Sequence, residues 1–336
     1  ELNVVSAILE NLPQTTEDIF NSCTGLTSVT IGNRLTSIGS GAFYGCTGLT
    51  SVTIPESVET IGNSAFQSCS LTSITIPDSV TSIGGAAFAE CTDLATVTLP
   101  NNINFTSIED FAFGGCTGLT SITIPNSVET IGYQAFENCY ILTSVTIGNN
   151  VESIGIEAFM STGLTSVTIP ISVTSIGINA FRNCSDLATV DLSVPKTVID
   201  SATNVFFNTA SLLTINVPYG TSGWVAGTGL TIGGNTNVTV NIITPEAMLF
   251  TVDASINTSF LVRRDSRDIY SGAIVWGDGS ADEALSGSGI VIIEHTFPST
   301  EVYQGMIIGT SVPSISFDYN RSLTSFENLG DVGLNS

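Results

Sequence analysis

The chain has 336 residues, of which 42% are hydrophobic and only 11% are charged. This apolar content is enough to bury a sizeable core, which excludes a mainly disordered chain. Acidic residues outnumber basic residues by 30 to 7, and the net charge of −23 argues against nucleic acid and anionic lipid as partners, because both bind clusters of lysine and arginine. No run of 18 apolar residues is present, so we expect no membrane insertion in this segment.

A phrase of about 23 residues recurs along the first two thirds of the chain. Clear copies are LTSVTIPESVETIGNSAFQSC, LTSITIPDSVTSIGGAAFAEC and LTSITIPNSVETIGYQAFENC. Self-similarity at this period is typical of leucine-rich repeats, in which each coil buries its apolar side only by stacking on its neighbours. We align the copies on their first leucines, which are Leu26, Leu49, Leu71, Leu94, Leu119, Leu142, Leu164, Leu187 and Leu212.

The coil at 49–69 shows how one copy is expected to fold. Val52 and Ile54 alternate with hydroxyl residues, which predicts a strand with one buried face that ends at Pro55. A second short extended piece follows, and we expect Gly62 to let the chain turn before Ala-Phe points back inside. The sequence therefore predicts a mainly β solenoid with a parallel sheet.

The repeated phrase resembles the BspA-like, or Treponema-type, leucine-rich repeat of bacterial surface proteins and some parasitic protists. The resemblance covers about residues 8–218, where strand, Pro, Ile-Gly and Ala-Phe-x-x-Cys recur together. It implies an extracellular or cell-surface solenoid used in adhesion and binding. The segment INVPYGTSGWVAGTGLTI also looks like the closing sequence of such arrays, and a polar cap is needed there to cover the last apolar layer.

All seven cysteines occupy one position of the repeat, and Thr162 and Ala210 take that place in two coils. Cysteines stacked in register lie about 4.8 Å apart with parallel Cβ vectors, which does not suit a disulfide, and a column diverges where metal ligands must converge. We therefore expect buried free thiols, with no metal and no cofactor. The column consists of Cys23, Cys46, Cys69, Cys91, Cys116, Cys139 and Cys184.

The outward positions of the predicted strands form two columns of hydroxyl residues. Such columns suit a solvated strand, where we expect them to hydrogen-bond along the stack. They also make candidate ligand-binding residues for a glycan or a protein, and a third interpretation is binding of ordered water. The candidates are Ser51, Thr53, Ser73, Thr75, Thr96, Thr98, Ser121, Thr123, Ser144, Thr146, Ser166 and Thr168.

Two further sets of side chains are predicted to face outward. Tyr44, Tyr133 and Tyr140 lie in or beside the Ala-Phe turns and form a possible lateral patch. The acidic residues of the second extended piece are scattered among Ser and Thr, and we interpret them as a solvated face that resists edge association. These are Glu59, Glu129 and Glu152.

A different pattern follows the linker IITPEAM. Alternating segments there predict a small β-sandwich, and WGDGS followed by HTF resembles the PKD-like domain of bacterial surface proteins, which implies an immunoglobulin-like spacer or binding module. The matching residues are Trp276, Asp278, Gly279, His295 and Phe297. We divide the chain into a partial repeat or cap at 1–25, the solenoid with its cap at 26–243, the PKD-like sandwich at 244–310, and the start of a further repeat segment at 311–336.

Enzyme functions fit the sequence poorly. His295 is the only histidine and no nucleophile motif accompanies it, so no catalytic residue is assigned. We predict a non-enzymatic adhesion module whose partner is a protein or glycan on a host or neighbouring cell. The alternative is a structural block of a filament, stalk or viral fibre, in which the partner is a copy of the chain itself. The start at Glu1 indicates either a removed leader or a fragment, and the ending DVGLNS favours a fragment. Because the last stretch resembles the start of a second repeat array, we expect the natural chain to continue past Ser336.

Overall fold

The structure is a computed structural model. It describes residues 17–218 and 221–243 with their side chains, and strand β1 (Ser6–Leu9) and the eight strands after residue 247 as backbone. The chain divides into two compact units, one made of Glu1–Val217 and Thr221–Asn241 and the other of Pro218–Gly220 and Ile242–Ser336.

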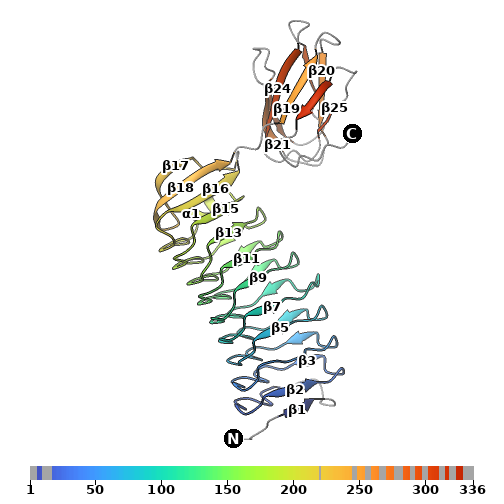
Figure 1. The fold of residues 1–336 in the computed structure, drawn as a ribbon, viewed down its shortest axis with the longest axis vertical. Helices are drawn as coiled ribbons and strands as arrows, with labels where there is room; N and C mark the ends of the chain where they lie inside the picture. The colour runs from blue at the N-terminus through green and yellow to red at the C-terminus, as the bar shows by residue number, and fades with distance from the viewer. Residues whose placement is uncertain are drawn as a thin grey trace. The chain divides into compact units, whose positions relative to one another are not determined.

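In the first unit the chain winds into coils stacked along one axis, as Figure 1 shows. Each coil begins on a first wall of short parallel strands whose side chains alternate between core and solvent. In β13, for example, Ser166 and Thr168 are exposed while Val167 and Ile169 are buried. The first-wall strands after β1 are β2 (Ser28–Ile31), β5 (Ser73–Thr75), β7 (Thr96–Thr98), β9 (Ser121–Thr123), β11 (Ser144–Thr146), β13 (Ser166–Ile169), β15 (Thr189–Leu192) and β16 (Leu213–Pro218).

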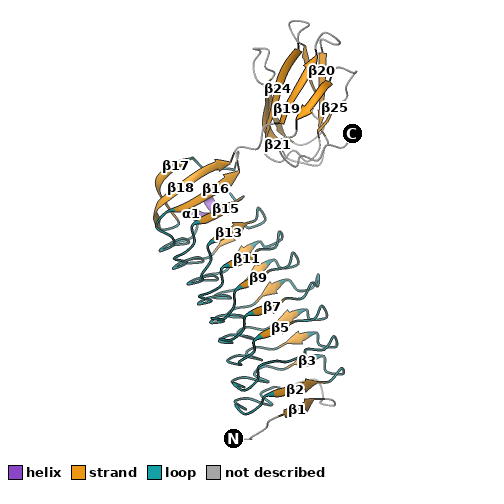
Figure 2. Cartoon of the chain, in the orientation of Figure 1, coloured by secondary structure: helices purple, strands orange, loops and turns teal. Residues whose placement is uncertain are grey.

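The first wall pairs in register but is divided into separate ladders. Ser73 lies opposite Thr96 in the β5–β7 ladder, and Thr123 lies opposite Thr146 in the β9–β11 ladder. In the coil at 49–69 the wall is reduced to a single bridge from Thr53 to Thr30, so the strand predicted before Pro55 is much shorter than expected. Figure 2 shows that loops make up most of each coil.

A second wall of two-residue parallel strands runs along the same stack, and the isoleucine of each strand is buried. These strands are β3 (Ser37–Ile38), β4 (Thr60–Ile61), β6 (Ser82–Ile83), β8 (Ser107–Ile108), β10 (Thr130–Ile131), β12 (Ser153–Ile154) and β14 (Ser175–Ile176). They form the ladders β3-β4-β6 and β14-β12-β10-β8.

A glycine follows every second-wall strand except β8, which Glu109 follows, and at β4 this glycine has a different role from the one predicted. Gly62 does not have a positive φ, so it is not needed for a turn. A Cβ added to it would lie 2.5 Å from the backbone nitrogen of Ser40, so its missing side chain lets neighbouring coils approach closely. The left-handed residues lie around Ala-Phe instead, four positions apart, as at Ser64 and Ser68 with φ of 54° and 58°.

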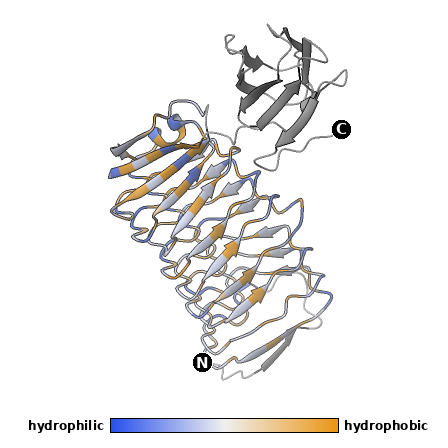
Figure 3. Cartoon of the chain, turned by 45° about the horizontal axis from the view of Figure 1, so that its top comes forward, coloured by the Kyte–Doolittle hydropathy of each residue, from blue (hydrophilic) through white to orange (hydrophobic). Residues whose placement is uncertain are grey.

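A column of phenylalanine rings forms the centre of the core. Neighbouring ring centroids are 5.1–5.8 Å apart and the rings are nearly parallel, within the separation favoured for aromatic pairs. Figure 3 shows hydrophobic residues, in orange, interspersed with paler residues of intermediate hydropathy along the strands of the solenoid. The rings belong to Phe20, Phe43, Phe66, Phe88, Phe113, Phe136, Phe159, Phe181 and Phe206.

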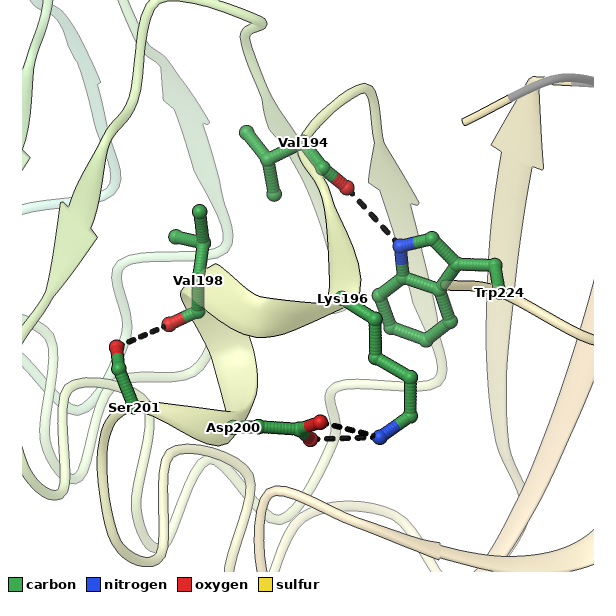
Figure 4. A network of polar contacts seen from close by, with 6 residues as sticks. All are labelled: Val194, Lys196, Val198, Asp200, Ser201 and Trp224. Carbon is green, nitrogen blue, oxygen red and sulfur yellow. Dashed lines mark hydrogen bonds and ion pairs between the residues drawn. The ribbon is translucent and has the colours of Figure 1, made fainter. Parts of the chain in front are cut away.

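The last coils are covered by helix α1 (Lys196–Asp200) and the antiparallel pair β17 (Gly227–Ile232) and β18 (Asn235–Ile243). The indole nitrogen of the buried Trp224 donates to the carbonyl oxygen of Val194 at 2.9 Å, as drawn in Figure 4. Strands β13, β15, β16, β18 and β17 form one sheet in that order, so the cap is continuous with the first wall.

The ninth coil differs from the sequence alignment by one residue. Leu212 is 69% exposed, and Leu213 is buried in its place. The cysteine position of this coil is Thr209, which is buried and whose hydroxyl donates to the carbonyl oxygen of Phe206, and not Ala210. The predicted alignment was wrong here because an extra residue between Thr209 and Leu213 shifts the inward-facing positions.

The second unit contains two antiparallel sheets. Their orders are β22-β21-β24-β19-β26 and β23-β20-β25. Asp278, Gly279 and the other PKD-like motif residues outside β23 lie outside the described residues, and of His295 only the backbone is described. The strands are β19 (Met248–Asp253), β20 (Ser259–Arg264), β21 (Tyr270–Val275), β22 (Glu283–Gly287), β23 (Ile292–Thr296), β24 (Val302–Gly309), β25 (Ile315–Phe317) and β26 (Leu323–Glu327).

Candidate binding surface

The twelve predicted hydroxyl residues all lie on the outside of the first wall, and all twelve are exposed. We call this surface the hydroxyl face. Parallel pairing brings equivalent residues of neighbouring coils side by side, as with Thr75 and Thr98 or Ser121 and Ser144. The predicted outward direction of these side chains is therefore confirmed.

The hydroxyls of this face do not bond to one another as expected. Within the described residues, none of the twelve side chains makes a hydrogen bond to another protein group. The second wall differs, because Thr60 Oγ1 donates to Ser37 Oγ at 2.8 Å and the Ser57 hydroxyl donates to the Leu35 carbonyl at 2.7 Å. The predicted bonding along the stack is thus wrong, and the hydroxyl face keeps its donors and acceptors free for other molecules.

A hollow of about 700 Å³ lies where β7, β9 and β11 end. Four of the predicted residues line it: Thr98, Ser121, Thr123 and Thr146. The other eight predicted residues do not line this hollow, so one third of the predicted hydroxyl residues surround one concave part of the hydroxyl face.

Three asparagines in the turns after these strands also line the hollow, and the sequence analysis did not identify them. They are Asn101, Asn126 and Asn149. The Asn126 Oδ1 atom accepts a hydrogen bond from the backbone nitrogen of Asn149 at 2.8 Å, which fixes one turn against the next. The signal in the sequence was an asparagine recurring three residues after the last strand residue, in PNN, PNS and GNN.

The hydroxyl face is uncharged over most of its length. From Ser28 to Thr168 its outward strand positions carry only Ser and Thr. At the cap the chemistry changes, because Asp191 Oδ1 accepts from the Asn216 amide at 2.8 Å and Asn216 Oδ1 accepts from the Asn241 amide at 3.1 Å. The acidic Glu59, Glu129 and Glu152 lie on the second-wall side of the coils, where they are exposed as predicted.

The cysteine column has a structural role. All seven thiols are free and buried, which confirms the expectation of no disulfide among them. Each thiol from Cys46 onward donates to a phenylalanine carbonyl of the preceding coil, as from Cys69 to Phe43 at 3.1 Å. Burial raises the pKa of Cys46 to about 11 and that of Cys139 to about 12, so these thiols stay protonated and unreactive at neutral pH. Among the described residues, no group of three acidic, His or Cys side chains is placed to hold a metal ion.

Comparisons with known proteins follow the same division of the chain. The model of the BspA type leucine rich repeat region, in six copies, matches residues 14–113 and 106–223. A solved leucine-rich repeat protein from Bacteroides ovatus is 28% identical with a TM-score of 0.60, over 71% of this chain and 61% of that one. A leucine rich cell surface protein from Faecalibacterium prausnitzii is 30% identical with a TM-score of 0.40, over 57% of this chain and 59% of that one. This chain thus spans about three fifths of either protein, and no curated protein sequence matches it.

Within the described residues, no helix is long and apolar enough to cross a lipid bilayer.

Proposed function

The chain belongs to the BspA-type leucine-rich-repeat family, and from this premise we propose that its solenoid is a non-enzymatic binding module that recognises a protein or glycan through the hydroxyl face. The observation that carries the proposal is the set of exposed hydroxyls without protein partners around the hollow at β7, β9 and β11. Hydroxyl and amide groups both donate and accept hydrogen bonds. They suit a ligand with many neutral polar groups.

Charge narrows the class of ligand further. Because the hydroxyl face is uncharged between Ser28 and Thr168, basic residues on a partner would add little to its affinity for this face. Each neutral hydrogen bond contributes only about 0.5–1.5 kcal/mol net. Affinity therefore comes from several contacts along the stack and from display of many copies on one surface.

We place the chain outside the cell or on its surface, bound to a protein or glycan of a host or neighbouring cell. Family membership supports this location, as does a chain that is polar mainly through Ser, Thr, Asn and Gly, with 11% charged residues. Direct labelling of intact cells with an antibody to the native chain tests it. Signal that appears only after the cells are permeabilised contradicts it.

The binding experiment uses the full chain on glycan and extracellular-protein arrays. A variant carrying Thr98→Val, Thr123→Val and Thr146→Val removes three hydroxyls at the hollow with little change of shape. The matched control carries Thr53→Val, Thr75→Val and Thr168→Val, which lie on the same face outside the hollow lining.

The hollow variant is expected to lose binding by about 10-fold or more, since two or three hydrogen bonds are removed, while the control keeps most of it. Equal losses in both variants, or no ligand on any array, contradict the assignment. Concentration-dependent polymers in light scattering would instead favour the structural, self-associating role.

For the second unit we propose a PKD-like β-sandwich that acts as a spacer or an additional binding module. Its support is the WGDG–HTF pattern together with two antiparallel sheets of five and three strands. A crystal structure of the full chain tests it, and a single-layer sheet or a further solenoid coil within 244–310 would contradict it.

A further inference from the structure

A second surface lies at the Ala-Phe turns, away from the hydroxyl face. In each turn two residues four positions apart have positive φ, and apart from Phe111 they are Gly, Ala or polar residues among the residues described. Phe111 is the exception, with a φ of 58° and 37% of its surface exposed. A bulky side chain in the left-handed region is a genuine outlier that costs about 1–2 kcal/mol. Such strain at an exposed aromatic residue is a reason to look for a function.

Phe111 begins an exposed apolar stripe that crosses four coils. Its ring meets the Tyr133 ring edge-on, with centroids 5.0 Å apart and planes at 86°. Tyr133, Ile156 and Ile178 follow in the next three coils, each one residue before the left-handed position that Phe111 occupies in its own coil, and are 38%, 45% and 45% exposed. Backbone hydrogen bonds from Gln134 to Ile156 and from Glu157 to Ile178, each 3.0 Å long, fix the coils at this spacing. Contiguous exposed apolar residues on a soluble protein mark interaction sites.

A hollow of about 380 Å³ adjoins the start of this stripe, and Phe111 forms part of its lining. Ala86, Ala89, Gly114 and Gly115 also line it, so the space exists because the turns on this side carry small side chains. The polar part of the lining consists of the acidic residues Glu90 and Glu137 and the neutral residues Gln67 and Asn138.

In the described part of the chain no ion pair neutralises the carboxylates at the hollow, and Glu90 Oε2 accepts a hydrogen bond only from a neutral group, the Ser68 hydroxyl, at 2.8 Å. Within the described residues, the one ion pair joins Lys196 and Asp200 in the cap. Partial burial and the nearby Glu157 raise the pKa of Glu137 above its usual value. Glu157 itself bonds to neutral groups, the amides of Gln134 at 2.6 Å and Asn179 at 3.1 Å and the hydroxyl of Tyr133. A cation entering the hollow would relieve this repulsion.

We propose that this edge docks a basic, amphipathic segment of a partner protein. An arginine or lysine of the partner enters the hollow between Glu90 and Glu137 and packs on the ring of Phe111. Apolar residues of the same segment cover Tyr133, Ile156 and Ile178. A cation over an aromatic ring already occurs at these turns, because the Arg182 guanidinium lies 5.4 Å from the centre of the Phe207 ring.

The test uses the full chain and a fluorescein-labelled peptide of sequence RLSRISKLSR, with binding followed by fluorescence anisotropy. One control peptide has Glu in place of every basic residue, and another has Ser in place of every Leu and Ile. Both controls are expected to bind at least about 10-fold more weakly, because the first loses the cations and the second loses the apolar contact.

Two protein variants locate the site. Glu90→Gln combined with Glu137→Gln removes the charges, and Phe111→Asn removes the ring while keeping a residue suited to positive φ. Each is expected to weaken binding about 10-fold, whereas the matched pair Glu129→Gln and Glu152→Gln on the second-wall side changes it less than about 2-fold. Unfolding midpoints measured by circular dichroism verify that Phe111→Asn remains folded.

Several outcomes overturn the proposal. The parent peptide fails to bind, or the second-wall pair reduces binding as much as the pair at the hollow, which would indicate unspecific attraction to an acidic protein. If the Ser-substituted peptide bound as tightly as the parent peptide, the apolar stripe would not contribute to binding. Self-association of the chain that the same variants abolish would assign the edge to a second copy instead of a partner protein.

Discussion

The close approach of neighbouring coils can be tested at two adjacent glycines. In Gly84→Ala, the new Cβ would lie 2.5 Å from the Asn63 side-chain oxygen, 2.6 Å from the Asn63 nitrogen and 2.8 Å from the Gly62 carbonyl carbon. In Gly85→Ala, the nearest atom is the Asp110 carbonyl oxygen at 3.3 Å. Neither glycine has a positive φ, so alanine fits the local backbone at both positions. The two substitutions differ only in what the added methyl group meets.

The magnitudes follow from these distances. Two of the three atoms that crowd position 84 belong to the backbone and cannot rotate away, and separating the coils would stretch the 2.8 Å hydrogen bond from Gly84 N to the Ile61 carbonyl. Overpacking of this kind costs about 1–3 kcal/mol, against a gain of about 0.4–1 kcal/mol from a stiffer unfolded chain. Gly84→Ala is therefore expected to lower the free energy of unfolding by about 1–2 kcal/mol, and Gly85→Ala to leave it within about 0.5 kcal/mol.

Guanidinium unfolding of the full chain, followed by circular dichroism at pH 7, measures both variants against the parent chain. The expected result is a lower midpoint for Gly84→Ala alone, with the slope unchanged. Equal midpoints for the two variants, or a higher midpoint for Gly84→Ala, would refute the role assigned to glycines such as Gly62 and Gly84 that follow second-wall strands. Those glycines would then serve the turn itself, as the sequence first suggested.

Three further predictions concern the core and the turn edge. The native pKa of about 11 for Cys46 and about 12 for Cys139 lies above the ordinary value of 9.0, so these thiols ionise at lower pH in the unfolded chain than in the native chain. The free energy of unfolding should therefore fall above pH 9 by about 1.4 kcal/mol per pH unit for each thiol. Equal unfolding midpoints at pH 8 and pH 10.5 would contradict this. Phe136→Ala removes a ring from between two others at 5.5 and 5.3 Å and should cost about 3–5 kcal/mol in chemical unfolding, and a loss below about 1 kcal/mol would mean that the stack contributes little. Glu137 has a raised pKa, so its negative charge destabilises the native state when the pH is above the ordinary carboxyl pKa of 4.5. Glu137→Gln should therefore raise the melting temperature at pH 7 and not at pH 3. A rise of the same size at both pH values would point to a cause other than charge.

Much of this fold follows from the sequence because every coil must bury the same side. The period places Leu49, Ile61 and Phe66 in the core, and all three are fully or almost fully buried. The same logic puts Thr53 and its equivalents outside and makes a disulfide impossible along the cysteine column. These results need only the spacing of the residues and the distance between stacked coils.

Other features depend on how far each coil is set from the next, which no single repeat encodes. The sequence predicted a turn at Gly62 because the contact between this glycine and the neighbouring coil cannot be seen within one repeat. The exposed Leu212 was aligned as a core residue because a leucine stands at both 212 and 213, so the residue type does not reveal the inserted residue. The hollow lined by Thr98 and Asn126 lies beside turns of unequal length, where PNNIN in one coil meets PNS in the next. The repeated sequence determined which residues face inward and which face outward. Only the packing of coils with unlike turns decided where the outer surface is concave, because the shape of that surface depends on contacts between repeats and not within them.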